Sequence, residues 1–237
     1  MQDLTGQRVL VLGGSSGIGL AAAARAAEAG AEVTIASRSQ AKLDAALAGL
    51  GPKARAAVLD TVDEAAVEAF FAEGTPWDHI VVSAAQTPSG PVRSLGLADA
   101  RSAMESKFWG AYRVARAARI REGGSLTLIS GFLSVRPSAS SVLQGAINAA
   151  LEALARGLAL ELAPVRVNAV SPGLIDTPLW SRLPGDKRDA IFARAAETLP
   201  ARRMGQPEDI ANAVLFLITT PFATGSTVRV DGGGAIA

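Results

Sequence analysis

Side chains that bind metals or carry redox chemistry are scarce in this sequence. Its 237 residues include no cysteine and a single histidine, His79. Without cysteine there can be no disulfide, no thiolate metal site and no thiol nucleophile. One histidine cannot build a histidine-rich centre, so we expect no bound metal.

Long apolar runs are missing as well. No stretch of about 18 uncharged apolar residues occurs, which argues against a membrane span. The first residues, MQDLTGQRVLVLGG, contain no apolar signal-peptide stretch followed by a cleavage site of small residues. These two absences predict a cytoplasmic protein with no membrane partner.

Neither sign of charge is in excess. The chain has 23 Lys and Arg against 22 Asp and Glu, a formal net charge of +1. A nucleic-acid surface would need basic residues gathered on one face, and we expect none. Apolar residues make up 49% of the chain, which is enough to bury a substantial core. Because no linker or repeat interrupts it, residues 1–237 are predicted to form a single domain.

Short runs rich in β-branched residues alternate with longer runs rich in Ala and Leu. The expected strands are 8–12, 32–36, 56–59, 79–83, 125–130, 165–170 and 226–230. The expected helices are 17–29, 40–50, 63–73, 98–120, 140–162 and 207–219, while 174–205 is expected to be irregular or to hold short helices. The strand runs are uninterrupted, as is typical of strands buried on both faces. The pattern predicts an α/β fold of the Rossmann type, with a doubly wound parallel sheet of about seven strands and helices on both faces.

A glycine-rich segment, GGSSGIG, stands between the first expected strand and the first expected helix. Glycines at this point let the backbone approach a pyrophosphate, and the following helix offers unpaired N–H groups and the positive end of its dipole. The candidate contacts are Gly13, Ser15, Ser16, Gly17, Ile18 and Gly19. The segment therefore predicts a dinucleotide site, although a tight turn without a ligand would have the same glycines.

The residues after the second expected strand bear on which dinucleotide binds. Sites for NAD place an acidic side chain there for the ribose 2′-hydroxyl, whereas arginine suits the 2′-phosphate of NADP. This chain has Ser37 and Arg38 and no acid at that turn. We therefore predict NADP(H) as the cofactor, with a solvated surface arginine as the alternative. Asp60, after the third expected strand, is a candidate for the adenine amino group, with Thr61 next to it.

Three longer segments carry a family resemblance. They are residues 151–178 (LEALARGLALELAPVRVNAVSPGLIDTP), GQPEDIANAVLFLI and TGSTVRVDGGG. Together with the glycine segment, in which Leu12 replaces the usual threonine, they make the chain resemble the short-chain dehydrogenase/reductase family over nearly its whole length.

The resemblance implies an NADP(H)-dependent oxidoreductase that acts on a carbonyl or alcohol group of a small-molecule substrate. It also implies a homo-oligomer, a dimer or tetramer, and a substrate lid at about 174–205. The family has Asn-Asn-Ala-Gly after the fourth strand, where this chain is read as Val82-Ser83-Ala84-Ala85. The implied cofactor contacts are Ser83, Ala84, Ala85, Pro172, Gly173, Ile175 and Thr177, together with Asn148.

The catalytic residues of the family are replaced in this chain. Its serine position is Gly131, with Ser130 beside it, and its Tyr-x-x-x-Lys motif falls on Gln144 and Asn148. Its catalytic asparagine falls on Lys107. In the family the tyrosine protonates the carbonyl oxygen, and a glutamine amide cannot act as a general acid near neutral pH. Loss of a positioned acid costs about 10²–10⁴-fold in rate. The chain therefore resembles a divergent member that lacks the motif.

Lys107 and Asn148 exchange the residue types that the family has at these two positions. We hypothesise that Lys107 supplies the missing ammonium from the opposite side, with Asn148 hydrogen-bonding it or the cofactor ribose. A desolvated lysine can also donate a proton. The candidate catalytic residues are thus Lys107, Ser130, Gln144 and Asn148. Two unrelated substitutions in an inactive site would leave the same pattern.

Three functions therefore stay open. The first is an NADP(H)-dependent oxidoreductase with a rearranged site. The second is a catalytically inactive NADP(H)-binding sensor or oligomer partner, and the third is a non-redox lyase or isomerase. Fold alone does not decide among them.

Overall fold

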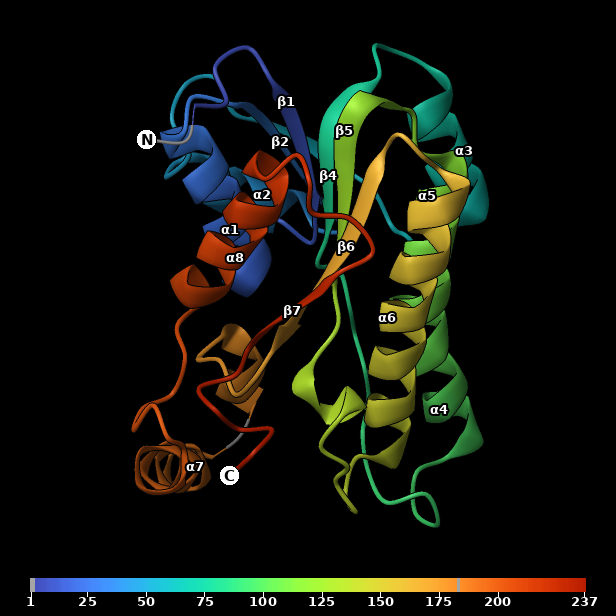
Figure 1. The fold of residues 1–237 in the computed structure, drawn as a ribbon. Coiled ribbons are helices and arrows are strands. Elements are labelled where there is room, and N and C mark those ends of the chain that lie inside the picture. The colour runs from blue at the N-terminus through green and yellow to red at the C-terminus, as the bar shows by residue number, and fades with distance from the viewer. Residues whose placement is uncertain (1–2, 183) are drawn as a thin grey trace.

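The computed structural model describes residues 3–182 and 184–237. Residues 1–2 and 183, which belong to the expected domain and to the expected lid, lie outside the described residues. Seven parallel strands form one sheet in the order β3-β2-β1-β4-β5-β6-β7, with helices on both faces (Figure 1). The Rossmann-type doubly wound sheet predicted from the sequence is confirmed.

The elements have the following bounds. The strands are β1 Arg8–Leu12, β2 Glu32–Ser37, β3 Arg55–Val58, β4 Trp77–Val82, β5 Ile120–Ile129, β6 Arg166–Pro172 and β7 Thr227–Val230. The helices are α1 Gly17–Glu28, α2 Gln40–Leu47, α3 Glu64–Ala72, α4 Leu97–Met104, α5 Gly110–Ala117, α6 Val142–Glu161, α7 Gly185–Thr198 and α8 Pro207–Thr219. A π-helical turn, Glu105–Trp109, joins α4 to α5, and two 3-10 turns cover Phe132–Ser134 and Pro178–Arg182.

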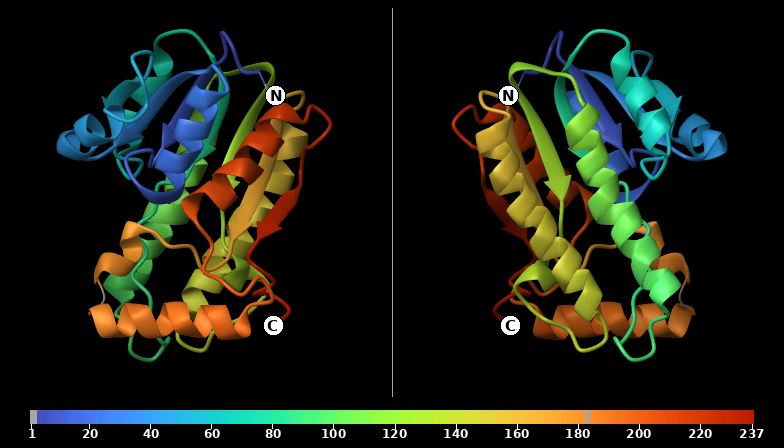
Figure 2. Two further views of the ribbon diagram at one scale, coloured as in Figure 1. Left: turned by 90° about the vertical axis from the view of Figure 1, so that its left-hand side faces the viewer. Right: turned by 90° about the vertical axis from the view of Figure 1, so that its right-hand side faces the viewer.

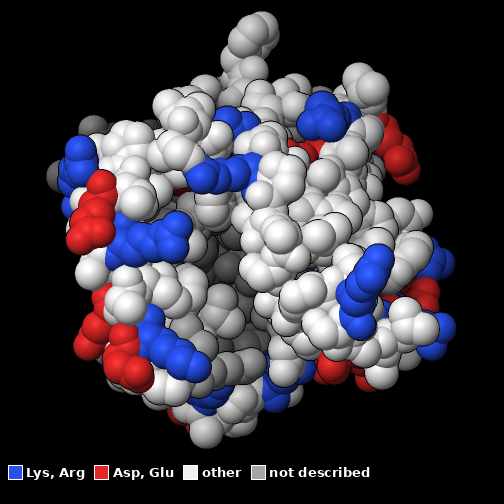
Figure 3. Space-filling view, turned by 90° about the horizontal axis from the view of Figure 1, so that it is seen from below, with Lys and Arg blue, Asp and Glu red and all other residues white. Residues whose placement is uncertain are grey.

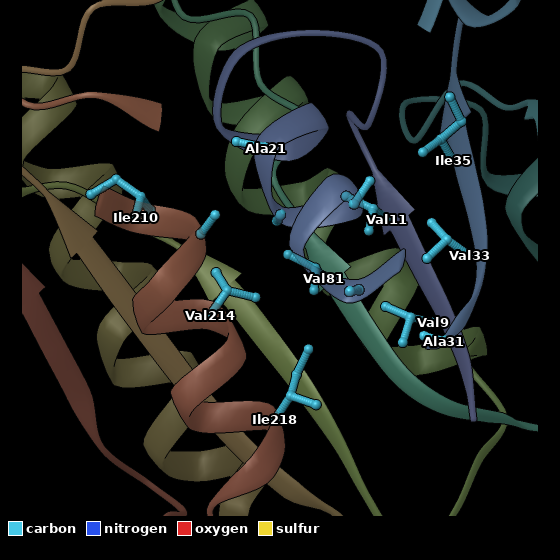
Figure 4. Packing of buried hydrophobic residues seen from close by; sticks show 14 of the residues in the cluster. Val9, Val11, Ala21, Ala31, Val33, Ile35, Val81, Ile210, Val214 and Ile218 are labelled. Carbon is cyan, nitrogen blue, oxygen red and sulfur yellow. The ribbon is translucent and has the colours of Figure 1, made fainter. Parts of the chain in front are cut away.

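Successive residues of the central strand face two separate halves of the core. Val9 and Val11 of β1 pack with residues of α1 and α8 on one face of the sheet (Figure 4). Leu10 and Leu12 pack with residues of α3, α5 and α6 on the other. Side chains alternate across a strand, so an uninterrupted apolar run can be buried on both sides. Within the described part of the chain, no helix is long and apolar enough to cross a membrane.

The strand order changes direction between β1 and β4, because the chain runs from β1 outward to β3 and then returns to β4. In sheets of this kind ligands bind beyond the carboxyl ends of the strands at such a switch point. This edge is the lower one in Figure 1, and α7 lies across it (Figure 2).

Two expected elements differ in the structure. The helix expected over 98–120 ends at Ala117, and residues 120–124 belong to β5, where Ile120 pairs with Trp77 of β4. Apolar spacing suggested a continuing helix there, but pairing with β4 decides the outcome. Segment 174–205 also holds a 14-residue helix, α7, that the sequence did not predict. Ala195 is its only residue classed as buried among those described, so the helix has no apolar stripe to announce it.

Candidate active site

The glycine segment draws three loops together at the carboxyl edge. A Cβ on Gly13 would lie 2.5 Å from the backbone nitrogen of Ala84, in the segment after β4. A Cβ on Gly17 would lie 3.3 Å from Cγ2 of Thr177, in the segment after β6. Both glycines have positive φ, +81° and +52°, which favours glycine independently of the available space. Only a residue without a side chain allows this close approach.

The amino end of α1 is left open toward that edge. Ser16 precedes the helix, and its side chain makes no capping hydrogen bond. The N–H groups of Gly13 and Gly14 instead donate to the carbonyl oxygen of Ala36, at 2.8 and 3.3 Å, which fixes the loop against β2. A helix start without a side-chain cap offers its first N–H groups and its dipole to an anion.

The end of β2 presents one cation and one hydroxyl. Arg38 is exposed and donates from Nη2 to Oε1 of Gln86, 2.9 Å away in the segment after β4. Oγ of Ser37 is buried and has no hydrogen-bond partner among the described residues. Buried hydroxyls are normally hydrogen-bonded, so the Ser37 hydroxyl is available to a ligand that binds at the end of β2.

The remaining predicted cofactor residues lie around the same edge. Asp60 accepts a hydrogen bond from the Val62 N–H at 3.1 Å, and Thr61 is buried against Gly110 of α5. Strand β4 ends at Val82, one residue before the expected end at Ser83, so Ser83 begins the segment that follows this strand.

The segment after β6 is tied to its neighbours. Gly173 donates its N–H to Val230 O at 3.0 Å, directly after Pro172 ends β6. Ile175 is buried, and its carbonyl oxygen accepts from Nε1 of Trp180 at 2.7 Å. These bonds fix the backbone that leads to Thr177 beside the glycine segment.

Lys107 lies in the π-helical turn between α4 and α5. Such turns contain one extra residue in a helix and often mark functional sites. Nζ of Lys107 donates to the carbonyl oxygen of Ser130 at 2.8 Å and to Oδ1 of Asn148 at 2.6 Å. An ammonium has three N–H donors. Its third has no partner among the hydrogen bonds of the described residues.

The surroundings of Lys107 weaken its hold on the proton. Burial lowers the pKa of its amine from 10.5 to about 8, and the charge of Glu152 opposes this shift. Desolvation disfavours the charged form of an amine, whereas a nearby carboxylate favours it. An amine of this pKa exists in both protonation states close to neutral pH.

Asn148 and Gly131 occupy adjoining space. Asn148 is 3% exposed, and a Cβ on Gly131 would lie 2.7 Å from its Nδ2. Gly131 has φ 163° and ψ 149°, an extended conformation open to any residue, so the restriction comes from Asn148 alone. The amide is therefore held between Lys107 on one side and a position without a side chain on the other.

Two further candidates are engaged elsewhere. Gln144 donates from Nε2 to Oγ1 of Thr87 at 2.7 Å, and its Oε1 is buried with no partner among the described residues. Oγ of Ser130 has one proton to donate; it lies 2.9 Å from Oε1 of Glu152, which we take as the acceptor, and 3.2 Å from the carbonyl oxygen of Val170. The Ser130 hydroxyl thus has its partners within the protein.

Seen from its carboxyl edge, the molecule is hollowed between the side that carries α7 and the side that carries α4 and α6 (Figure 3). Lys and Arg side chains lie around the rim of this hollow. Such a surface is suited to an anionic ligand.

Comparison with known proteins identifies the family. A family model described as enoyl-(acyl carrier protein) reductase matches residues 13–234. The short-chain dehydrogenase/reductase ucsE of Acremonium sp is 34% identical to this chain, over 97% of this chain and 95% of the relative. The chain belongs to the short-chain dehydrogenase/reductase family.

Two solved structures are similar to this short-chain dehydrogenase/reductase over nearly its whole length. One is a crystal structure of a small-chain dehydrogenase in complex with NADPH, 36% identical, with a TM-score of 0.84 over 98% of this chain and 99% of that one. The other is the apo structure of a short chain oxidoreductase from Pseudomonas aeruginosa PAO1 containing an atypical catalytic center. It is 29% identical, with a TM-score of 0.88 over 98% of each chain.

Sequence reasoning about this short-chain dehydrogenase/reductase brought Lys107, Ser130 and Asn148 forward together, and the structure places these three in direct contact. It missed Gln86, the partner of Arg38, and Glu152, the acceptor for Ser130. Glu152 follows Asn148 by four residues on α6, and this spacing puts both on one helix face. That spacing was the available signal.

Proposed function

We propose that this short-chain dehydrogenase/reductase is an NADP(H)-dependent oxidoreductase that interconverts a carbonyl and an alcohol group of a small molecule. The family membership supports the reaction class, and the NADPH complex of a 36% identical structure supports the cofactor. Arg38, with no acidic residue at its turn, supports NADP(H) over NAD(H).

The residues at the carboxyl edge fit such a cofactor. The open start of α1 suits a pyrophosphate, and the glycine segment leaves room for it at the backbone. The guanidinium of Arg38 and the unpaired hydroxyl of Ser37 suit a phosphate on the ribose. When bound, the nicotinamide supplies or accepts the hydride.

The observation that carries the proposal is the anchored ammonium of Lys107. Two of its N–H groups are fixed on Ser130 and Asn148, so the third has a defined direction. In reduction, Nζ gives its proton to the substrate oxygen as this becomes a hydroxyl, and the amine then regains a proton from water. In oxidation the neutral amine takes the proton instead. A pKa of about 8 serves both directions near neutral pH.

The proposal is tested with a panel of aldehydes and ketones, following the loss of NADPH absorbance. We expect turnover by the wild type and a loss of about 10²–10⁴-fold in kcat for Lys107→Ala, with NADPH binding retained. Lys53→Ala is the matched control, because Lys53 lies exposed in the turn before β3.

Other outcomes would favour the alternatives. Tight NADPH binding with no turnover of any carbonyl would favour a non-catalytic cofactor-binding protein. Conversion of a substrate without a net change in absorbance would favour a lyase or isomerase. Equal turnover by the wild type and Lys107→Ala would remove the amine from the mechanism.

A further inference from the structure

A buried carboxylate lies beneath the proposed proton donor. Glu152 of α6 is 8% exposed, and its Oε1 accepts hydrogen bonds from Oγ of Ser130 at 2.9 Å and Oγ of Ser134 at 2.7 Å. Carboxylates are almost never this deeply buried without partners, and here both donors are neutral hydroxyls. The charge of Glu152 is therefore hydrogen-bonded without being neutralised by direct contact.

Ser130 joins this carboxylate to Lys107. The Ser130 hydroxyl donates to Glu152, and its carbonyl oxygen accepts from Nζ of Lys107. Its N–H donates to Val170 O of β6 at 2.8 Å. Every polar group of Ser130 is thus used, and its peptide cannot turn without breaking one of these bonds.

Two residues on one face of α6 interact with Lys107, one directly and one through Ser130. Asn148 accepts directly from Lys107, and Glu152 lies one helical turn further along and acts through Ser130. Helix α6 therefore stabilises the ammonium of Lys107 in two ways: Asn148 accepts a hydrogen bond from it, and the negative charge of Glu152 favours its protonated form.

We propose that Glu152 is a positioning residue, which fixes the Ser130 carbonyl under Lys107 and keeps the amine charged until it delivers its proton. The predicted effect of Glu152 on the reaction rate rests on the proposed function. The electrostatic link between Glu152 and Lys107 stands independently of turnover.

Other charged side chains on the segments that flank the site are already engaged. On its own helical segment, Glu105 and Arg113 form an ion pair with each other. After β5, Arg136 donates from Nη1 to the carbonyl oxygen of Gly234 at 2.5 Å. Within the described residues, Glu152 is the charge that acts on the pKa of Lys107, and it acts to raise it.

The test measures the protonation of Lys107 itself. The sequence has four lysines, Lys42, Lys53, Lys107 and Lys187. Protein labelled with 13Cε-lysine therefore gives a small set of resonances, and Lys107→Arg identifies the one of interest. Its pH titration is compared in the wild type, in Glu152→Gln, and in Glu161→Gln as the matched control at the exposed end of the same helix.

We expect the wild-type Lys107 resonance to titrate near pH 8. Glu152→Gln keeps an oxygen that can accept from both serines but removes the charge, so its midpoint should fall by on the order of one pH unit. Glu161→Gln should leave the midpoint unchanged. Glu152→Asp keeps the charge but moves it further from Lys107, because the side chain is shorter. Its midpoint should lie between those of the wild type and Glu152→Gln. This variant carries the test if Glu152→Gln does not fold.

A lower pKa of Lys107 should also slow carbonyl reduction, because less of the amine is protonated. A drop of one unit from pH 8 lowers the protonated fraction at pH 8 from about one half to about one tenth. Carbonyl reduction by Glu152→Gln should therefore fall about five-fold at pH 8 and be close to wild type at about pH 6.

The two proposals fail separately. A shifted Lys107 midpoint in a protein that reduces no carbonyl would support the role of Glu152 and reject the oxidoreductase. An unshifted midpoint in both Glu152→Gln and Glu152→Asp would overturn the role of Glu152, whether or not the enzyme turns over.

Discussion

Gly131 and Asn148 form a matched pair of residues. The family serine at position 131 would bring a Cβ within 2.7 Å of Asn148 Nδ2. Asn148 is buried and anchored by Lys107, so its amide cannot retreat without losing that hydrogen bond. Restoring the serine alone should therefore displace the lysine rather than repair the site.

Gly131→Ser should accordingly destabilise the protein by about 1–3 kcal/mol, as is usual for overpacking in a buried place. Unfolding in urea measures this loss, and the Lys107 proton titration reports the displaced amide. Gly157→Ser on the outer part of α6 is the control, because nothing lies within 4 Å of its Cβ position. An unchanged unfolding midpoint in Gly131→Ser would show that Asn148 moves freely.

His79 is a buried residue of the sheet and lies outside the candidate active site. Its ring nitrogens lie 2.8 Å from Oγ of Ser125 and 2.7 Å from Oε1 of Gln7. Burial, with a contribution from Arg166, lowers the pKa of His79 from 6.5 to about 4. The folded protein therefore holds a neutral imidazole where the unfolded chain would already be protonated.

This difference predicts a loss of stability in acid. Between pH 6.5 and 4 the unfolded state binds the extra proton, so stability is complete above this window and declines as the pH falls through it. Going from pH 7 to about 4.5 should cost up to about 2–3 kcal/mol from this residue alone. Urea unfolding at the two pH values measures the loss. His79→Gln should show a smaller pH dependence, and an equal dependence would contradict the assignment.

The start of α8 shows how one side chain can stabilise an element. Asp209 accepts the N–H of Gln206 at 2.7 Å and two bonds from Arg203, at 2.6 and 2.8 Å. The Gln206 side chain accepts in return from the Asp209 backbone, which completes a capping box. Hydrogen bonding from Arg203 holds the pKa of Asp209 below its usual range.

Asp209→Ala should destabilise the protein by about 1–2 kcal/mol, because it removes a helix cap and a paired arginine at once. Glu208→Ala is the control in the same turn, where Glu208 is exposed. Thermal or urea unfolding of the two variants side by side measures the difference. Similar losses in both would mean that general charge at the helix start, and not the cap, provides the stability.

Elements with strong local signals were predictable from the sequence. Helix α8 was predicted with its observed bounds, since a Pro at its start and an apolar face mark it. The π-helical turn that presents Lys107 was not, because no residue type announces one extra residue per turn. The burial of Glu152 was harder to predict: its spacing from Asn148 put it on the same helix face, but a glutamate on an Ala-rich helix is usually exposed, and tertiary packing is what covers it.

At the scale of the whole molecule, cofactor binding should appear as added stability. A ligand at about 100 times its Kd adds about 2.7 kcal/mol, which raises Tm by roughly 5–10 °C in a chain of this size. We expect this shift with NADPH and a smaller one with NADH.

Arg38→Asp should reduce the NADPH preference by about ten-fold or more, since it removes a charge-assisted bond. Fluorescence titration of nicotinamide and tryptophan measures the two affinities. Arg55→Asp, at the far end of the neighbouring strand β3, is the control. An unchanged ratio in Arg38→Asp would overturn the role of Arg38.

Assembly is a second property of the whole molecule. A dimer or tetramer stays a prediction, as does a cytoplasmic location. Trp109 of the π-helical turn and Tyr112 of α5 pack edge to face and are 43% and 42% exposed, so they are candidates for a contact with a second copy. Sedimentation velocity on the wild type and on Trp109→Ala would test this contact.

The parallel sheet separates two groups of hydrogen-bonded polar residues. His79 and Arg166 lie near the amino ends of β4 and β6, whereas Lys107, Asn148 and Glu152 gather beyond the carboxyl end of β5. Changes at well-separated places with no shared partners usually add. Variants selected for heat resistance at one end of the strands and for new substrates at the other can therefore be recombined in one gene with little interference.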